Sequence, residues 1–210
     1  MDVAGFENRR WTTDTQKVEF RHRAALDLIE GGTVLDVGSG DGLLLSLLKE
    51  KGITTEGIDI SEEGVRRSVE RGLTARVYDP DAPLPFADDA FDTVVMLDVL
   101  EHVYAPEELL AEAKRVARKN IIVGVPNFSS LPARLQVLAG SVPENNEPLK
   151  GHVYWFNYRV LADLARASGL TVAALKTNTF SPFSKLWPAA SDAFPNLLAL
   201  SFVAKLESHS

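Results

Sequence analysis

The sequence predicts an α/β fold in which helices cover both faces of a doubly wound, mostly parallel sheet. Apolar segments of strand length alternate with segments of helical length from residue 16 to residue 125. The runs Val94-Val95-Met96-Leu97 and Ile121-Ile122-Val123 are apolar without interruption, which is typical of strands buried on both faces. A glycine-rich turn, Gly38-Ser39-Gly40-Asp41-Gly42, joins one of these strands directly to a leucine-rich helix.

The first half of the chain is divided clearly by its turn and capping residues. A first helix over 16–30 ends at Gly31-Gly32. Ser61 is suited to cap a helix that ends near Gly72, and Pro106 is suited to the first turn of another. We therefore expect strands at 33–37, 54–59, 75–78, 91–97 and 120–125, with helices at 41–51, 61–72 and 106–117.

The second half is less regular. We expect helices at about 129–139 and 158–167 and strands at 170–176 and 198–206, which brings the sheet to seven strands. The segments 126–157 and 180–197 are long, and long loops in compact domains are often functional, so we expect them to form a lid over the ligand edge. One domain over 1–210 is expected, with 1–30 as an N-terminal flap and helix in which Trp11 closes over the site.

Composition limits the classes of protein to which the chain can belong. The 210 residues carry a net charge of −7 and include no cysteine, which excludes disulfides, thiolate metal sites and cysteine nucleophiles. The acidic balance disfavours a general nucleic-acid-binding surface. Since there is no bilayer-spanning apolar run and residues 1–10 are polar, we expect a cytoplasmic location and no membrane partner. No metal site is predicted.

Four acids fall at or just after the ends of predicted parallel strands: Asp36, Asp59, Asp79 and Asp98. Ligands bind at this edge of a doubly wound sheet, and a carboxylate at a strand end can accept both hydroxyls of a ribose. The glycine spacing is G-x-G-x-G rather than G-x-G-x-x-G, and no Walker-type phosphate loop occurs. Asp36 beside the turn would repel a pyrophosphate but attract the ammonium and sulfonium of S-adenosylmethionine.

With these residues in place, the chain resembles the class I S-adenosylmethionine-dependent methyltransferases over roughly residues 21–206. The segments 34–42, 57–61, 86–92 and 97–103 look like consecutive motifs of that family. Within it, Leu43–Lys49, Arg71–Leu73 and Val125–Phe128 are similar to the MetW-like group. The segments Asp98–His102 and His152–Phe156 look more like general small-molecule methyltransferases.

The resemblance implies a Rossmann-like seven-stranded sheet whose last strand is antiparallel. It also implies that Asp36 holds the methionine ammonium and that Asp59 accepts the ribose hydroxyls. The other residues to which it assigns cofactor contacts are Gly38, Ser39, Gly40, Ile60, Tyr78, Asp79, Pro80, Leu97, Asp98 and Val99.

The expected reaction is a direct in-line transfer of a methyl group to an O or N atom of a small molecule, with S-adenosylhomocysteine as the product. A protonated acceptor needs a general base, and His102 and His152 are the candidates. Arg21, His22 and Arg23 are expected on a solvated face of the first helix.

Other functions stay open. The MetW resemblance allows a regulatory or activating subunit that binds a partner enzyme, for example in methionine biosynthesis, and a homodimer is equally open. A nicotinamide-dependent dehydrogenase is disfavoured by the glycine spacing. An RNA methyltransferase is disfavoured by the acidic charge.

Overall fold

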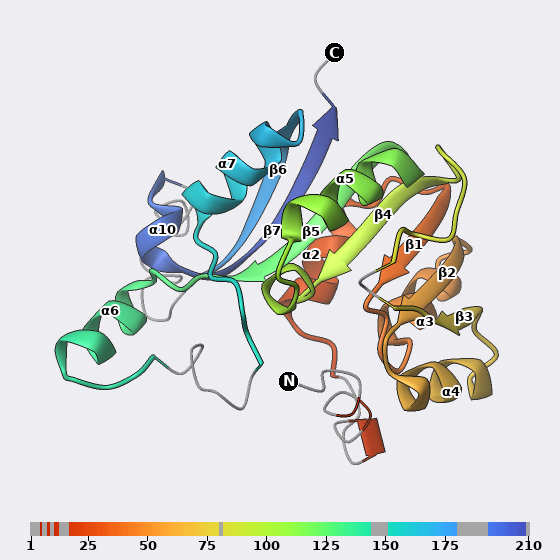
Figure 1. Cartoon of the computed structure of the whole chain (residues 1–210), viewed down its shortest axis with the longest axis horizontal. Helices are drawn as coiled ribbons and strands as arrows, with labels where there is room; N and C mark the ends of the chain where they lie inside the picture. The colour runs from red at the N-terminus through yellow and green to blue at the C-terminus, as the bar shows by residue number, and fades with distance from the viewer. Residues whose placement is uncertain are drawn as a thin grey trace.

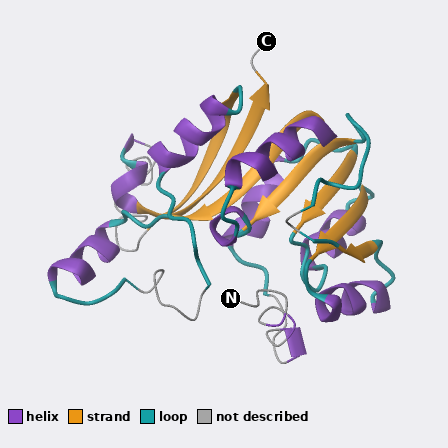
Figure 2. Ribbon diagram, in the orientation of Figure 1, coloured by secondary structure: helices purple, strands orange, loops and turns teal. Residues whose placement is uncertain are grey.

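The computed structural model describes residues 5, 8, 11–12, 17–79, 82–143, 151–179 and 193–208. A seven-stranded sheet with the order β3-β2-β1-β4-β5-β7-β6 forms its centre, and helices cover both faces (Figures 1 and 2). The first five strands are parallel, while β7 runs antiparallel to both β5 and β6. This architecture confirms the predicted fold class. The strands are β1 Thr33–Val37, β2 Thr54–Asp59, β3 Ala75–Val77, β4 Phe91–Leu97, β5 Ala117–Pro126, β6 Leu170–Thr179 and β7 Ala199–Ser208.

Most helices lie where the sequence predicts them. They are α2 Phe20–Leu28, α3 Leu43–Glu50, α4 Glu62–Glu70, α5 Pro106–Val116, α6 Leu131–Leu138, α7 Tyr158–Ala167 and α10 Pro195–Leu198, with a 3-10 turn η1 at Leu100–His102. The Ser61 side chain accepts a hydrogen bond from the N–H of Gly64, as a capping residue should.

Three strands extend beyond their predicted ranges, β7 by two residues to Ser208 and the other two by more. β5 begins at Ala117, directly after α5, because Ala117 pairs with Phe91 across an irregularity in the register. β6 continues to Thr179 because β7 pairs with it along its whole length. The extensions of β5 and β6 depend on the neighbouring strand, which local sequence does not reveal.

The core is divided between the two faces of the sheet by the alternation of side chains along each strand. Val94 and Met96 of β4 pack on the side of α5 and α7, whereas Val95 packs on the side of α2 and α3. All three side chains are fully buried. Helices on both faces explain why the strands need continuous apolar runs.

The strand order reverses at β1, which lies between β2 and β4. In doubly wound sheets the crevice outside the carboxyl ends of the strands at such a switch point is the usual ligand site. Asp36 on β1, Asp59 at the end of β2 and Asp98 after β4 all belong to this edge.

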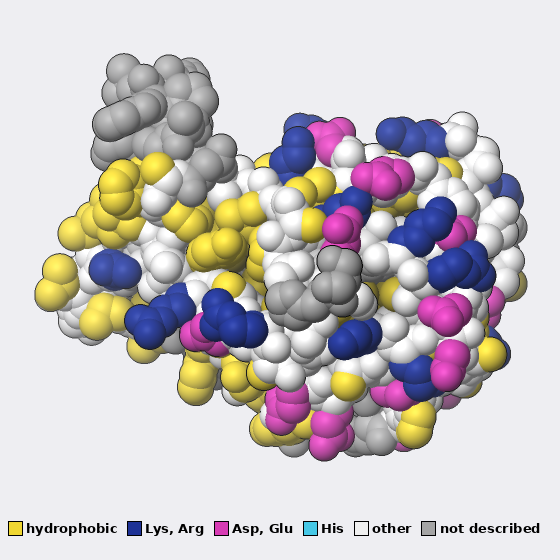
Figure 3. Space-filling view, turned by 90° about the horizontal axis from the view of Figure 1, so that it is seen from above, with side chains coloured by type: hydrophobic (Ala, Val, Ile, Leu, Met, Phe, Trp, Pro, Cys, Tyr) yellow, Lys and Arg dark blue, Asp and Glu magenta, His cyan; other side chains and the backbone are white. Residues whose placement is uncertain are grey.

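α6 projects away from the two helical layers (Figure 1). Of its residues only Ala133 is buried, while Leu135, Val137 and Leu138 are largely exposed. Figure 3 shows hydrophobic side chains gathered at this end of the molecule. Across the described ranges, no helix combines the length and apolar character that crossing a membrane requires.

Candidate active site

A pocket of about 1000 Å³, counting the part that is open to solvent, lies at the carboxyl edge of the sheet. The glycine turn, the ends of β2 and β4, the start of α2 and the N-terminal residue Trp11 contribute to its wall. It brings together residues that are distant in the sequence, at the position where the strand order reverses. Its lining includes most of the residues predicted to contact the cofactor.

The glycine turn presents backbone rather than side chains to the pocket. The N–H groups of Gly38 and Ser39 both donate to the carbonyl of Ile58, at 2.8 and 3.1 Å. Gly38 has φ +77°, and a Cβ placed on it would lie 2.5 Å from Cγ2 of Val99. Both the backbone conformation and the close approach of Val99 therefore require glycine at this position.

Asp59 ties the turn to the second strand. Its Oδ2 accepts a 2.7 Å hydrogen bond from the N–H of Gly40, and its Oδ1 accepts one of 2.8 Å from the N–H of Ser61. The side chain is buried but still lines the pocket, and Ile60 follows it there. Asp59 thus fixes the positions of both loops that form this part of the wall.

Asp36 is a buried acid that faces the pocket from β1. It is only 3% exposed, and burial, together with the neighbouring charge of Asp59, raises its pKa to about 8. A buried carboxylate without a countercharge is costly, so this position favours a cationic ligand. The ammonium of S-adenosylmethionine fits that requirement.

The third strand contributes less than the sequence predicts. Tyr78 lines the pocket, and its N–H donates to the carbonyl of Asp59 at 2.9 Å. Asp79 is exposed and is not part of the lining, and Pro80 lies outside the described residues. The cofactor contacts that the resemblance assigns to Asp79 and Pro80 stay predictions.

The expectation that Arg21 and His22 lie on a solvated face of the first helix is wrong. Arg21 and His22 line the pocket instead of facing solvent, whereas Arg23 is exposed. Burial, and then the charge of Arg21, lower the pKa of His22 to about 4, so its ring is neutral at pH 7. Its Nδ1 accepts a hydrogen bond from the N–H of Glu19, which forms a reciprocal capping box at the start of α2. The Glu19-x-x-His22 spacing is the sequence signal that could have located the start of this helix, and with it the position of His22.

Beyond β4, Leu97, Asp98 and Val99 line the pocket as predicted. Asp98 has φ +55°, which is uncommon for a residue other than glycine. Its Oδ2 lies 3.1 Å from Nη1 of Arg21. This ion pair joins the end of β4 to the first helix across the pocket.

The N-terminal segment is attached beside the glycine turn. Trp11 is 3% exposed and lines the pocket. Oδ1 of Asn8 accepts hydrogen bonds from Oγ of Ser61 and from the N–H of Glu63, at 2.8 and 3.2 Å. The described part of this segment is therefore bound to the start of α4.

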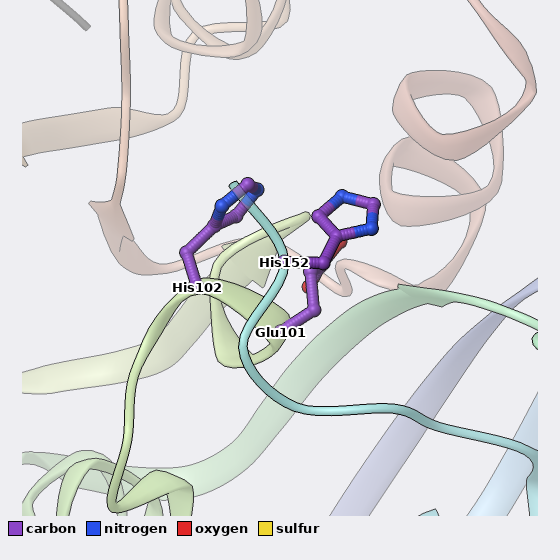
Figure 4. A group of neighbouring side chains, drawn as sticks. All are labelled: Glu101, His102 and His152. Atoms are coloured by element: carbon purple, nitrogen blue, oxygen red, sulfur yellow. The ribbon is translucent and has the colours of Figure 1, made fainter. Parts of the chain in front are cut away.

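The two candidate histidines lie next to each other, close to the pocket (Figure 4). His102, in η1, lines the pocket, and His152 packs against it with ring centroids 4.8 Å apart. Glu101 lies beneath them, 1% exposed, and burial followed by the charge of Asp98 raises its pKa well above the ordinary value. Glu101 is the residue that sequence reasoning missed.

The segment that carries His152 is tied to η1. The N–H groups of Val153 and Tyr154 both donate to the carbonyl of Glu101, at 2.8 and 3.0 Å. Within the described residues, neither 126–157 nor 193–197 contributes to the lining of the pocket, and 180–192 lies outside those residues. The lid therefore stays a prediction.

Comparisons with known proteins agree with this geometry. A family model described as methionine biosynthesis protein MetW matches residues 20–164. A ubiquinone biosynthesis O-methyltransferase of Paraburkholderia phymatum is 27% identical over 183 residues, covering 81% of this chain and 78% of that protein. A phosphatidylethanolamine N-methyltransferase of Cereibacter sphaeroides is 34% identical over 151 residues, covering 68% of this chain and 74% of the relative.

Among solved structures, magnesium protoporphyrin IX methyltransferase from Synechocystis PCC 6803 with bound S-adenosylhomocysteine superposes with a TM-score of 0.69. The two chains are 18% identical, and the match covers 99% of this chain and 98% of the other, which shows a shared fold. The family model covers more than half of the sequence, including the glycine turn and the four strand-end acids. The chain therefore belongs to the MetW family and is a class I S-adenosylmethionine-dependent methyltransferase.

Proposed function

We propose that the protein transfers the methyl group of S-adenosylmethionine to an O or N atom of a small molecule. The observation that carries this proposal is the pair of buried acids, Asp36 and Asp59, on either side of a glycine turn in one pocket. Asp36 would hold the methionine ammonium, and Asp59 would hold the ribose hydroxyls. The cofactor supplies an electrophilic methyl group activated by the sulfonium charge.

The chain's own contribution to the reaction is positioning. Val99 fixes the floor of the pocket against the glycine turn, and Leu97 lies beside it at the end of β4. Holding a nucleophile in line with a methyl group at near contact supplies a large part of the acceleration of a displacement. Trp11 and Leu109 are apolar parts of the same lining, and they reduce the access of water to the reacting atoms.

A small acceptor suits the space that remains. The pocket continues from the β4 end towards His102 and Val103, where a second molecule can approach the methyl group. The two sequence relatives act on different atoms, one being named an O-methyltransferase and the other an N-methyltransferase. Both O and N acceptors therefore belong in the screen.

The test is the formation of S-adenosylhomocysteine by the purified protein with panels of phenols, aliphatic alcohols and amines. We expect product with at least one panel, its formation to be abolished in Asp59→Ala, and the methylated acceptor to be identified by mass spectrometry. Cofactor binding without methyl transfer, combined with a stable complex with a second enzyme, would instead support the regulatory subunit that the MetW resemblance allows.

A further inference from the structure

Glu101 occupies an unusual position beside the pocket. Its carboxylate is 1% exposed, and within the described residues neither oxygen has a hydrogen-bond partner. An unpartnered buried carboxylate is among the costliest groups that a protein can retain. The carboxylate of Asp98, three residues earlier, adds negative charge nearby, and the positive charge of Arg21 offsets the effects of burial and of Asp98 only in part. Such a group is expected to meet a cation when the protein functions.

Two imidazoles lie next to this carboxylate. One ligand atom from each of Glu101, His102 and His152 lies within 4.8 Å of the others, and Figure 4 shows the three side chains grouped together. Nδ1 of His102 lies 3.3 Å from the carbonyl of Gly151. If Nδ1 donates to that carbonyl, Nε2 carries the lone pair, which is the usual arrangement of a metal-ligating histidine.

The backbone holds the three residues in this arrangement. The paired hydrogen bonds from Val153 and Tyr154 to the Glu101 carbonyl fix the loop that carries His152 against η1. Phe128 packs edge-on against the His152 ring, with centroids 5.6 Å apart. The cluster therefore combines η1 with the segment around His152, and backbone hydrogen bonds hold these two parts of the chain together.

We propose that Glu101, His102 and His152 bind a divalent transition metal at the acceptor end of the pocket, and that the metal holds the oxygen of a hydroxyl acceptor. The second half of this proposal rests on the proposed function. Two imidazoles and one carboxylate with open positions suit Zn²⁺ or a similar metal, whereas Mg²⁺ prefers an all-oxygen site. Metal–nitrogen bonds of about 2.1 Å require the ligand atoms to move closer together, which side-chain rotation can achieve.

The chemistry favours an oxygen acceptor. A metal-bound hydroxyl has a lowered pKa, so its proton leaves to solvent and a nucleophilic oxygen remains. That oxygen forms the new O–C bond as the C–S bond breaks, and the electron pair of the C–S bond stays on sulfur. The products are a methyl ether, S-adenosylhomocysteine and one proton. In this arrangement His102 and His152 are metal ligands rather than the general bases expected from the sequence.

The experiment measures metal binding without any cofactor. The full chain is stripped with a chelator and titrated with Zn²⁺ by calorimetry, and Co²⁺ is added in parallel to record its visible spectrum. The variants are Glu101→Gln and His152→Asn, and Glu112→Gln serves as the control because Glu112 pairs with Arg115 on α5. Glu101→Gln keeps the size of the side chain and removes no hydrogen bond of the described structure, so it should fold.

We expect one Zn²⁺ per chain, with affinity at least about tenfold weaker in Glu101→Gln and His152→Asn and unchanged in Glu112→Gln. No binding by the wild type, or equal binding by all variants, would overturn the site. Equal methylation of hydroxyl acceptors with and without metal would overturn the assigned role in the reaction. If the protein binds Zn²⁺ but not S-adenosylmethionine, the proposed function is wrong and the metal site stands, because the metal titration is done without the cofactor.

Discussion

The Asp59 carboxylate accepts a 2.7 Å hydrogen bond from the backbone N–H of Gly40, so the acid at the end of β2 holds the glycine turn that follows β1. Oδ1 of the same side chain accepts the N–H of Ser61. One residue therefore shapes the pocket wall and presents a carboxylate to the ligand. A second carboxylate that holds backbone elsewhere on β1 allows the loss of the ligand contact to be distinguished from the loss of structural hydrogen bonds.

Asp59→Ala should lower both stability and cofactor affinity. Losing two hydrogen bonds to a charged acceptor is expected to cost about 2 to 4 kcal/mol of unfolding free energy. Asp92→Ala is the control, because Asp92 also accepts a backbone N–H, that of Thr33 at 3.0 Å, but at the other end of β1, where it pairs with Arg118 and Lys119 as well. Denaturant unfolding should show that both variants lose stability, with Asp92→Ala losing at least as much, while only Asp59→Ala should lose S-adenosylmethionine binding. Equal loss of binding in both variants would contradict a direct role for Asp59.

Asp36→Asn should make the protein more stable while it loses cofactor affinity. The folded pKa of about 8 lies above the unfolded value of 3.8, so the folded state prefers the protonated carboxyl. Stability is therefore lost as the pH rises from about 4 to 8. The variant lacks this cost and should be about 2 to 4 kcal/mol more stable near pH 7.5. Unfolding free energies measured across this pH range test the prediction, and parallel curves for the two proteins would disprove it.

Cofactor binding should release a proton near pH 7. Asp36 is largely protonated in the free protein at that pH, and an ammonium beside it favours the ionised form. Calorimetry at pH 7 in buffers with different ionisation enthalpies should show up to about one proton released per molecule bound, and affinity should rise from pH 6 to pH 7.5. Binding enthalpies that do not depend on the buffer would place the ammonium away from Asp36.

Gly38→Ala should impair the pocket far more than Gly52→Ala does. Both glycines have φ near +75°, so both substitutions carry the backbone strain of a left-handed residue. The Cβ on Gly38 meets Val99 at 2.5 Å, whereas nothing lies within 4 Å of the Cβ on Gly52. The two variants should lose stability through strain, but only Gly38→Ala should also lose cofactor affinity by about tenfold or more. Similar cofactor affinities of the two variants would show that the added methyl group at position 38 does not disturb the pocket, which contradicts the prediction.

The sequence indicates correctly which residues lie at the carboxyl edge of β1 and β2, because the signals for that edge are local. A buried strand, a glycine turn and an acid at the next strand end are each visible within a few residues, and they place Asp36 and Asp59 correctly at one edge. The same reasoning applies to the bounds of β1, β2 and β4, which have clear apolar runs between turns.

The acceptor half depends on contacts between distant segments. Glu101 stands between Leu100 and His102 in the sequence, and only the fold shows that it is buried close to His152. From the sequence, Arg21 and His22 are expected on an exposed helix face. In the structure the start of α2 lies near the end of β4, where Arg21 pairs with Asp98. The Arg21–Asp98 pair is set by tertiary packing, so no local pattern indicates it.

Calorimetric titration of the purified full chain with S-adenosylmethionine and S-adenosylhomocysteine, with NAD as the control, tests the central claim most directly. The account predicts micromolar binding of the first two at one site per chain and no binding of NAD. A folded protein that binds neither S-adenosylmethionine nor S-adenosylhomocysteine, or that binds NAD instead, would contradict it.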